Sequence, residues 1–227
     1  MKKISLGVVF FLTFFLAVSA HAYTVNVNYI DGTTQVTTGL TGYQTTGAMM
    51  AGMKVTAYFP DLSSETLFWA ATGASSGGVE GTGWSLNQSG DTFGGLWTLS
   101  AITDLISVHI DAGLGDAVFD VVSGDYGTDG SYLGLPFSVE SLSGVDINSI
   151  TATYVIAVAL EGAVPVGDLY RHLGIGFSDN WTGELQFKAD TDSLLIAGDL
   201  QPVPEPLTML LLGLGLAGLT GMRRRME

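Results

Sequence analysis

Residues 150–160 read ITATYVIAVAL, and this stretch decides the fold class. Apolar residues run through it almost without interruption, and several of them are β-branched. Residues of this kind fit the pleated surface of a strand better than the surface of a helix. A continuous apolar run between polar turn residues therefore predicts a central β-strand that is covered on both faces.

Shorter runs of similar character lie on either side of this stretch. Val25, Val27 and Tyr29 alternate with polar residues, and the Asp31-Gly32 pair that follows predicts a hairpin turn. In residues 184–188, Leu185 and Phe187 alternate with polar residues, which is typical of a sheet with one face in water. Further strands are expected at 55–59, 66–71, 96–99, 105–111, 117–122 and 169–177.

Clusters of Gly, Ser, Asn and Asp separate these runs, notably at 74–83 and 123–131, and they predict loops. Residues 38–53 offer room for one short helix, which several glycines weaken. Many short strands divided by frequent turn signals predict an all-β body, an antiparallel β-sandwich of jelly-roll type, over residues 23–200.

The first 22 residues have the pattern of a secretory signal peptide. Lys2 and Lys3 precede an apolar run at 4–18, and Ala20 and Ala22 form an A-x-A cleavage site. Cleavage by signal peptidase is expected after Ala22. The alternative is an uncleaved N-terminal anchor, although the apolar run is short for a membrane span.

The C-terminal end carries a second address signal. Residues 201–206 form a Pro-rich linker, and the uncharged, Leu- and Gly-rich stretch 207–222 predicts a short transmembrane helix. Arg223, Arg224 and Arg225 begin a basic tail at 223–227, which should stay on the cytoplasmic side. The signal peptide sends the body out first, so both ends of the chain predict the same topology.

The order Val203-Pro204-Glu205-Pro206, apolar helix and arginine cluster resembles the PEP-CTERM sorting tag of exosortase-processed surface proteins of Gram-negative bacteria. The resemblance implies that a membrane-embedded exosortase recognises the chain and cleaves near the Pro-Glu-Pro triplet. It further implies a precursor held transiently in the inner membrane with its body in the periplasm, then delivery to the cell surface or the extracellular space. The alternative is an ordinary C-terminal tail anchor.

The body is similar, more loosely, to a recurrent ectodomain of such proteins, for which the resemblance implies a β-sandwich. The similarity lies in residues 110–120, 165–170 and 187–192.

Charge excludes one class of partner. The body holds twenty acidic side chains against only Lys54, Arg171 and Lys188. Because phosphate backbones are bound by Lys and Arg, no nucleic-acid partner is expected. The chain contains no cysteine, which rules out disulfides, thiolate metal sites and thiol catalysis.

Histidine chemistry is not expected in the body. His109 points to the polar face of its strand with Ser107 and Asp111, and His172 sits beside Arg171. No nucleophile motif accompanies either residue, so both are interpreted as surface or partly buried structural histidines.

A calcium site is one hypothesis for the acidic residues, because calcium prefers oxygen ligands on flexible loops. The spacing differs from that of an EF-hand, and Asp also serves simply as a turn residue. The candidate ligands lie close together in a Gly-rich region: Asp111, Asp116, Asp120, Asp125 and Asp129.

Glycan contact is the other hypothesis. Trp84 and Trp181 lie in Gly-, Asn- and Ser-rich surroundings where an exposed ring would stack on a sugar, although packing in the core or in a turn is the favoured interpretation. Trp69 and Trp97 are assigned to the core. The lack of a catalytic set favours a non-catalytic surface or matrix protein, and its association with exopolysaccharide and biofilm is what the PEP-CTERM resemblance implies. The alternative is an envelope glycosidase that uses paired carboxylates.

Overall fold

The computed structural model describes residues 25–42, 45–122, 133–163 and 166–202, and in this part the protein is all-β. Its strands join in one 15-stranded sheet that is mainly antiparallel, which confirms the predicted all-β class. Two 3-10 turns accompany them, η1 (Ala112–Gly115) and η2 (Ile147–Ser149). The strands are β1 (Asn26–Ile30), β2 (Gln35–Thr37), β3 (Leu40–Gly42), β4 (Lys54–Tyr58), β5 (Ser64–Phe68), β6 (Ala70–Ala71), β7 (Ser76–Glu80), β8 (Trp84–Ser89), β9 (Trp97–Asp111), β10 (Ala117–Asp120), β11 (Ser138–Leu142), β12 (Ile150–Leu160), β13 (Leu169–Lys188), β14 (Asp190–Leu194) and β15 (Gln201–Pro202).

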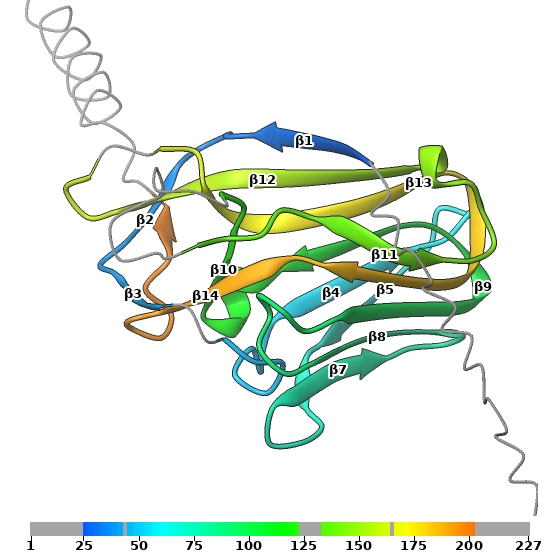
Figure 1. Cartoon of the computed structure of the whole chain (residues 1–227), viewed down its shortest axis with the longest axis horizontal. Coiled ribbons are helices and arrows are strands. Elements are labelled where there is room, and N and C mark those ends of the chain that lie inside the picture. The colour runs from blue at the N-terminus through cyan, green and yellow to red at the C-terminus, as the bar shows by residue number, and fades with distance from the viewer. Residues whose placement is uncertain (1–24, 43–44, 123–132, 164–165, 203–227) are drawn as a thin grey trace, which may run out of the picture.

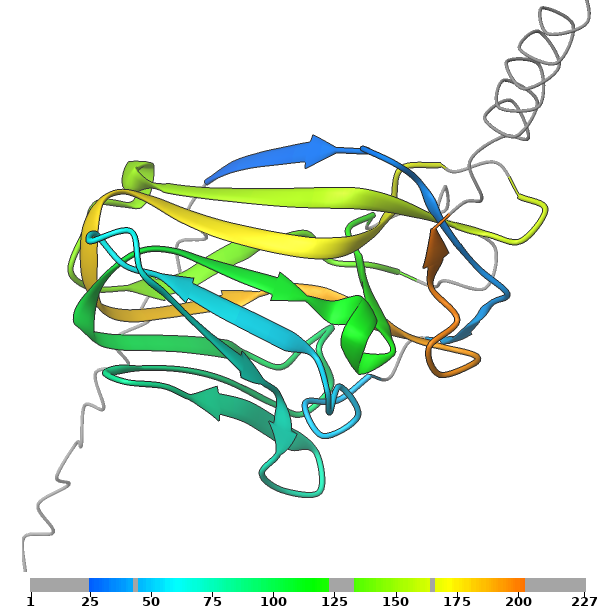
Figure 2. The ribbon, with the colours of Figure 1, turned by 180° about the vertical axis from the view of Figure 1, so that it is seen from behind.

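Two long strands, β9 and β13, determine the architecture. They run antiparallel to each other along their length, with Leu173 opposite Ile110 near one end and Leu185 opposite Leu99 near the other. Between these pairs the register shifts, and both strands double back at the same end of the molecule (Figures 1 and 2). The sheet therefore folds over on itself.

The fold divides the sheet into two halves that share β9 and β13. The first half has the order β5-β4-β9-β13-β12-β1, and the second has β6-β7-β8-β9-β13-β11. Cross-strand rows of apolar side chains line one face of each half, among them Val55, Ile110 and Leu173 in the first. These residues belong to one buried cluster with Leu99 and Leu185 of the second half. Because the chain has no disulfides, its main source of stability is the burial of the two apolar faces, one from each half, in this single cluster.

Aromatic rings occupy the middle of this cluster. Trp97 stacks on Phe187 at 5.8 Å between ring centroids and lies 5.5 Å from Trp69. Trp69 and Trp97 are buried, as predicted. The hydroxyl of Tyr154 on β12 accepts a hydrogen bond of 2.9 Å from the backbone N–H of Phe137, just before β11, so the aromatic core also connects the two halves.

The fold-back was not predicted from the sequence. Residues 96–99 and 105–111 were expected to be two strands, as were 169–177 and 184–188, but each pair lies in one continuous strand. Exposed residues at the bends, such as Ile102–Asp104 and Ser178–Asn180, interrupt the apolar pattern as a turn would. The backbone nevertheless keeps its strand pairing on both sides of the bend.

The predicted hairpin at Asp31-Gly32 is wrong. β1 and β2 do not pair with each other; both lie parallel to β12, β1 along Thr151–Val155 and β2 along Val158–Leu160. Gly32 adopts a left-handed φ of 56°, so the pair bends the chain without reversing it.

Between its two parallel partners β12 is kinked at Ile156, which has a left-handed φ of 65°. Burial follows this division. Residues 150–155 alternate between buried and half-buried, whereas Ala157–Ala159 are buried in succession. The prediction that β12 is covered on both faces therefore holds only after the kink.

Two further expectations are corrected. β7 lies within the stretch 74–83 that was predicted to be a loop, because Gly77 and Gly78 pack against neighbouring strands without side chains of their own. In the described part of 38–53 the structure has β3 and turns in place of a helix.

No helix within the described ranges is long and apolar enough to cross a membrane. The predicted signal peptide at 1–22 and the predicted membrane helix at 207–222 lie outside those ranges.

Candidate functional site

A cleft of about 610 Å³ lies beside the place where β9 bends, and we call it the bend cleft. Three separate segments contribute to it: the β4–β5 turn with the start of β5, the β7–β8 turn, and the bend of β9 itself. Its volume is within the range of small-molecule sites, which combine apolar surface with a few convergent polar groups. The lining residues are Phe59, Pro60, Asp61, Ser63, Glu65, Thr82, Thr103 and Asp104.

Glu65 is the best-positioned polar group of the bend cleft. Its Oε2 accepts hydrogen bonds from the Trp84 indole Nε1 at 2.7 Å and from the backbone N–H of Thr82 at 2.9 Å. The Thr82 hydroxyl donates to Oε1 at 3.2 Å. These hydrogen bonds, the one from the Thr82 backbone first, lower the pKa of Glu65. The carboxylate is thus ionised and held in one orientation.

The turn between β4 and β5 fixes a second carboxylate. Ser63 donates from its hydroxyl at 2.6 Å and from its backbone N–H at 2.9 Å to Oδ1 of Asp61. The hydroxyl contact is the first cause of the lowered pKa of Asp61, and the backbone contact adds to it. Asp104 on the β9 bend is exposed and supplies a third carboxylate to the lining.

A glycine allows these segments to meet. Gly83 has φ of +80°, and a Cβ at this position would lie 2.2 Å from the hydroxyl of Thr103 on the β9 bend. Its carbonyl also accepts hydrogen bonds from the backbone N–H groups of Ile102 and Thr103. Only a residue without a side chain permits this approach between the β7–β8 turn and the bend.

Two large apolar side chains stand exposed next to the lining. Leu62, between Asp61 and Ser63, is 88% exposed, and Ile102, next to Thr103, is 90% exposed. Within the lining itself, Phe59 and Pro60 provide the apolar surface that a ligand in the bend cleft would meet.

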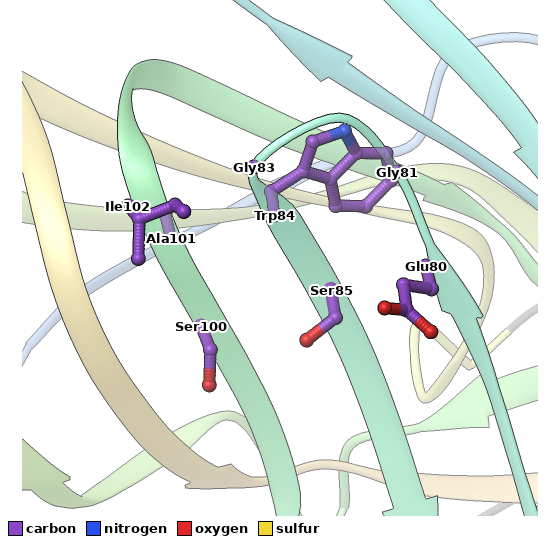
Figure 3. Close-up of a pocket in the computed structure, with 8 residues that line it drawn as sticks. All are labelled: Glu80, Gly81, Gly83, Trp84, Ser85, Ser100, Ala101 and Ile102. Atoms are coloured by element: carbon purple, nitrogen blue, oxygen red, sulfur yellow. The ribbon is translucent and has the colours of Figure 1, made fainter.

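A smaller pocket of about 270 Å³ adjoins the same β7–β8 turn, on the second half of the sheet (Figure 3). Glu80, Ser85 and Ser100 lie on adjacent strands there, and Ile102 belongs to the lining as well. The Trp84 ring sits beside the Gly81–Gly83 turn.

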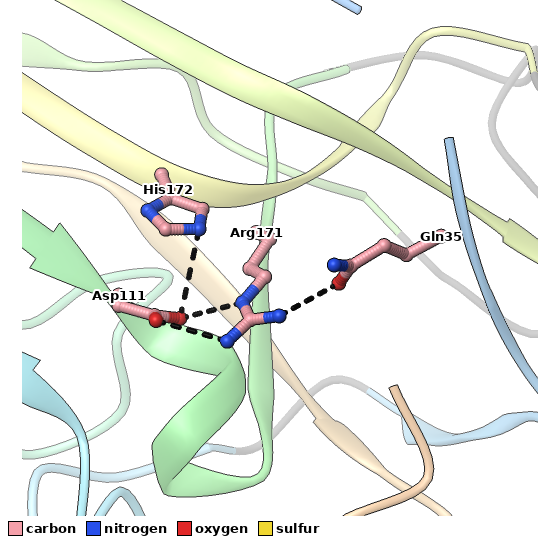
Figure 4. A network of polar contacts seen from close by, with 4 residues as sticks. All are labelled: Gln35, Asp111, Arg171 and His172. Carbon is pink, nitrogen blue, oxygen red and sulfur yellow. Dashed lines mark hydrogen bonds and ion pairs between the residues drawn. The ribbon is translucent and has the colours of Figure 1, made fainter. Parts of the chain in front are cut away.

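A polar network joins β2, β9 and β13 on the first half (Figure 4). Arg171 binds Asp111 through two hydrogen bonds, Nε to Oδ1 at 2.7 Å and Nη2 to Oδ2 at 2.9 Å, and its Nη1 donates to Gln35 at 3.0 Å. His172 Nε2 lies 3.8 Å from Asp111, beyond hydrogen-bond distance, and burial lowers the pKa of this histidine. Asp111 therefore holds an arginine and does not orient a histidine base.

Both histidines lie at surface or partly buried positions, as the sequence predicted. His109 is exposed on the outer face of β9 and packs against the ring of Tyr58 with centroids 4.9 Å apart. His172 is half-buried.

The hypothetical calcium ligands are not brought together in the described residues. Asp111 is bound to Arg171, so it is not available as the ligand that the sequence predicted. Asp116 follows η1 in a left-handed conformation and accepts a hydrogen bond of 2.6 Å from the Gly198 backbone, and the buried Asp120 accepts one of 3.2 Å from Val122. Asp125 and Asp129 lie outside the described residues. Within the part that is described, no group of three or more His, Asp or Glu is placed to hold a metal ion.

The two tryptophans considered for glycan stacking are both buried, which agrees with the favoured interpretation of core packing and not with glycan contact. Trp84 is 3% exposed, and Trp181 is fully buried. The Trp181 ring stacks on Phe177 with centroids 4.6 Å apart, and its Nε1 donates to the Ser143 carbonyl at 2.8 Å. Neither ring offers a face to a sugar; Trp84 acts through its N–H on Glu65 instead.

Sequence reasoning missed a buried acidic group on the β10–β14 pair. Asp120 lies directly opposite Asp190, and Asp192 follows on the same face of β14. Burial, together with the neighbouring charges of Asp192 and Asp120, raises the pKa of Asp190 to about 8. The signal available in the sequence was the spacing of two residues between Asp190 and Asp192, which places both side chains on one face of β14.

Glu65 was also missed as a site residue. It shares a face of β5 with the half-buried Leu67. The signal available in the sequence was the spacing of two residues between this acid and an apolar residue, which places both on one face of a strand. The sorting residues Val203–Pro206 and Arg223–Arg225, and the cleavage residues Ala20 and Ala22, lie outside the described part.

In a comparison with family models, residues 202–225 match the model of the PEP-CTERM protein-sorting motif. The chain therefore carries this motif at its C-terminus, as the resemblance in the sequence implied. Searches of curated proteins and of solved structures find no match. The matched residues begin at Pro202, the last residue of β15, so the motif follows the folded body directly.

Proposed function

Because the chain ends in the PEP-CTERM protein-sorting motif, we propose that its body is a non-catalytic protein of the cell surface or extracellular matrix, associated with secreted exopolysaccharide and biofilm. The motif itself implies an exported protein that an exosortase sorts to the cell surface. This motif is the observation that carries the proposal.

Two properties of the body support an association with polysaccharide. Its charge is strongly acidic, which disfavours anionic partners and leaves neutral and cationic ones. Its bend cleft combines hydroxyl and carboxylate acceptors with the apolar side chains of Phe59 and Pro60. Sugar rings present both hydroxyl groups and C–H faces, so such a lining suits them.

The fate of the protein in cells tests the proposal. In a triple variant Pro204→Ala/Glu205→Ala/Pro206→Ala, the protein should remain in the inner-membrane fraction instead of the surface and matrix fractions. Thr208→Ala, just beyond the triplet, is the matched control and should fractionate as the natural protein does. Unchanged delivery of the triple variant would contradict the proposal. Delivery of the natural protein to the surface without co-fractionation with polysaccharide would contradict it as well.

We further propose that the body is a β-sandwich of jelly-roll type. The fold-back of β9 and β13 supports this description, because each half of the sheet contributes an apolar face to one core. An experimental structure with two face-to-face sheets about 10 Å apart would agree with it.

An envelope glycosidase is the second candidate, since the bend cleft gathers Asp61, Glu65 and Asp104. Glycosidases use two carboxyl groups about 5–10 Å apart, one of them an acid of raised pKa. The shifted pKa values in this cleft, those of Asp61 and Glu65, are lowered, which favours binding over proton donation. Hydrolysis of any glycan by the full chain, abolished by Glu65→Gln, would favour the enzyme.

A further inference from the structure

The bend cleft also indicates which kind of polysaccharide the body takes. We propose that it binds amine-bearing sugar units of a positively charged polysaccharide. This inference rests on the proposed association with polysaccharide and names its ligand class and its site.

The first support is the charge of the lining. Of its eight residues three are carboxylates, Asp61, Glu65 and Asp104, and none is Lys or Arg. The body as a whole has twenty acidic side chains against three basic ones. Uronate or sulfated chains would be repelled by the charge of the whole body and by the carboxylates of the cleft. Protonated amines would be attracted by the same two sets of charges.

The second support is that two of the three carboxylates are already fixed. Glu65 is held by Trp84 and Thr82, and Asp61 by Ser63, through hydrogen bonds of 2.6–3.2 Å. A carboxylate has about four acceptor positions, so these contacts leave capacity for ammonium and hydroxyl donors. Because these acceptors are already held in position, less conformational entropy is lost when a ligand binds to them.

The third support is the combination of the remaining groups. Ser63, Thr82 and Thr103 bring hydroxyls that donate to and accept from sugar hydroxyls. Phe59 and Pro60 supply an apolar wall, and the exposed side chains of Leu62 and Ile102 stand at the neighbouring positions in the chain. A simple inorganic cation would not use this apolar surface, and the described residues contain no cluster placed to hold a metal ion.

Calorimetric titration of the full chain, purified in detergent, tests the inference with three oligosaccharides of equal length. They are a fully deacetylated glucosamine hexasaccharide, its N-acetylated counterpart and a hexamer of uronate units. The glucosamine oligomer should bind about tenfold or more tightly than the N-acetylated one, because several amines each gain an ion pair of modest strength. The uronate oligomer should not bind.

Asp104→Lys provides the site test. Asp104 is exposed, so the variant should keep the melting temperature of the natural protein. The variant should weaken glucosamine binding about tenfold. An exposed ion pair raises the affinity up to about fivefold, and the reversed charge of the lysine adds a repulsion of similar size. Glu161→Lys makes the same charge change at an exposed position beyond the far end of β12 and should change affinity less than about twofold.

The outcomes separate this inference from the proposed function. Equal binding of the N-acetylated oligomer, or equal loss in both lysine variants, overturns the inference while an association with polysaccharide stands. No binding of the glucosamine oligomer also overturns it. Failure of the natural protein to co-fractionate with the polysaccharide of its own cells overturns the proposed function itself.

Discussion

Asp190 is a buried carboxyl whose protonation state affects the stability of the folded body. Its Oδ1 accepts hydrogen bonds from the hydroxyl of Thr92 at 2.9 Å and from the backbone N–H of Thr191 at 2.8 Å. Burial and the charges of Asp192 and Asp120 raise its pKa from 3.8 to about 8. The folded state therefore binds a proton that the unfolded chain releases near pH 4.

This raised pKa predicts a loss of stability as pH rises. The contribution of Asp190 is complete below its unfolded pKa and is lost progressively until pH passes about 8. The slope is at most about 1.4 kcal/mol per pH unit, the value for one linked proton. Asp190→Asn keeps an acceptor for Thr92 and does not titrate, so its melting temperature relative to that of the natural protein should rise from pH 5 to pH 9. Asp179→Asn, at an exposed position, is the control. An Asn variant that loses stability equally at both pH values would contradict the assignment.

Arg171 and Asp111 form a mostly buried ion pair, with the arginine side chain 18% exposed and the aspartate 5% exposed. Arg171→Ala should reduce the free energy of unfolding by about 3–5 kcal/mol, because it leaves a buried carboxylate without its cation. Urea denaturation measures this loss. The double variant Arg171→Met/Asp111→Leu removes both charges and should cost clearly less than the single change. A double variant as unstable as the sum of its two single changes would show that the pair is not coupled.

At the scale of elements, the contact between β7 and the turn before β4 depends on a glycine. A Cβ on Gly77 would lie 2.1 Å from the Trp69 indole nitrogen and 2.2 Å from the carbonyl oxygen of Gly47. Trp69 also donates to that carbonyl at 2.7 Å, so there is little room to move apart.

Gly77→Ala should therefore reduce the free energy of unfolding by about 3 kcal/mol, the upper end of the usual cost of overpacking. Gly94→Ala is the matched control, because Gly94 is exposed and a Cβ there would meet nothing within 4 Å. It should change stability by no more than about 0.5–1 kcal/mol. Thermal melting compares the two, and equal effects would contradict the packing inferred at Gly77.

The elements also show where sequence patterns were sufficient. The eleven-residue strand β12 was predicted with its correct ends, because its apolar run is long and its flanks are polar. β9 and β13 were each predicted as two strands, since a bend and a turn both interrupt hydrophobic alternation. Only pairing with a distant strand distinguishes them, and local patterns do not contain that information.

For the whole molecule, the sorting signal was predictable and the bend cleft was not. The signal is a contiguous pattern in residues 202–225, and the family match agrees with it. Asp61, Thr82 and Asp104 lie in three segments that each resemble an ordinary turn or strand. The fold-back of β9 brings these segments together, so the cleft could not be predicted before the topology was known.

Processing at both ends predicts the mass of the mature protein. Signal peptidase should leave Tyr23 as the first residue, and the exosortase should remove the chain beyond the Pro-Glu-Pro triplet at 204–206. Intact-mass spectrometry of protein recovered from the cell surface should match a chain that lacks both segments. A mass that includes residues 207–227 would contradict processing at the C-terminus.

The direction of the strands has a mechanical consequence. β15 pairs with β2, and β2 pairs with β12 at Val158–Leu160, whereas Ile150 at the other end of β12 pairs with Phe177 near the bend. The C-terminal end of the described body, at β15, and the bends of β9 and β13 are thus at opposite ends of the strands (Figure 1). Tension between a cell and a ligand in the cleft would run along β9, β12 and β13, and it would shear many perpendicular hydrogen bonds at once instead of opening them one by one. In the proposed role at the cell surface, the same geometry that shapes the cleft would let the body resist a pull between its C-terminal end and a ligand in the cleft.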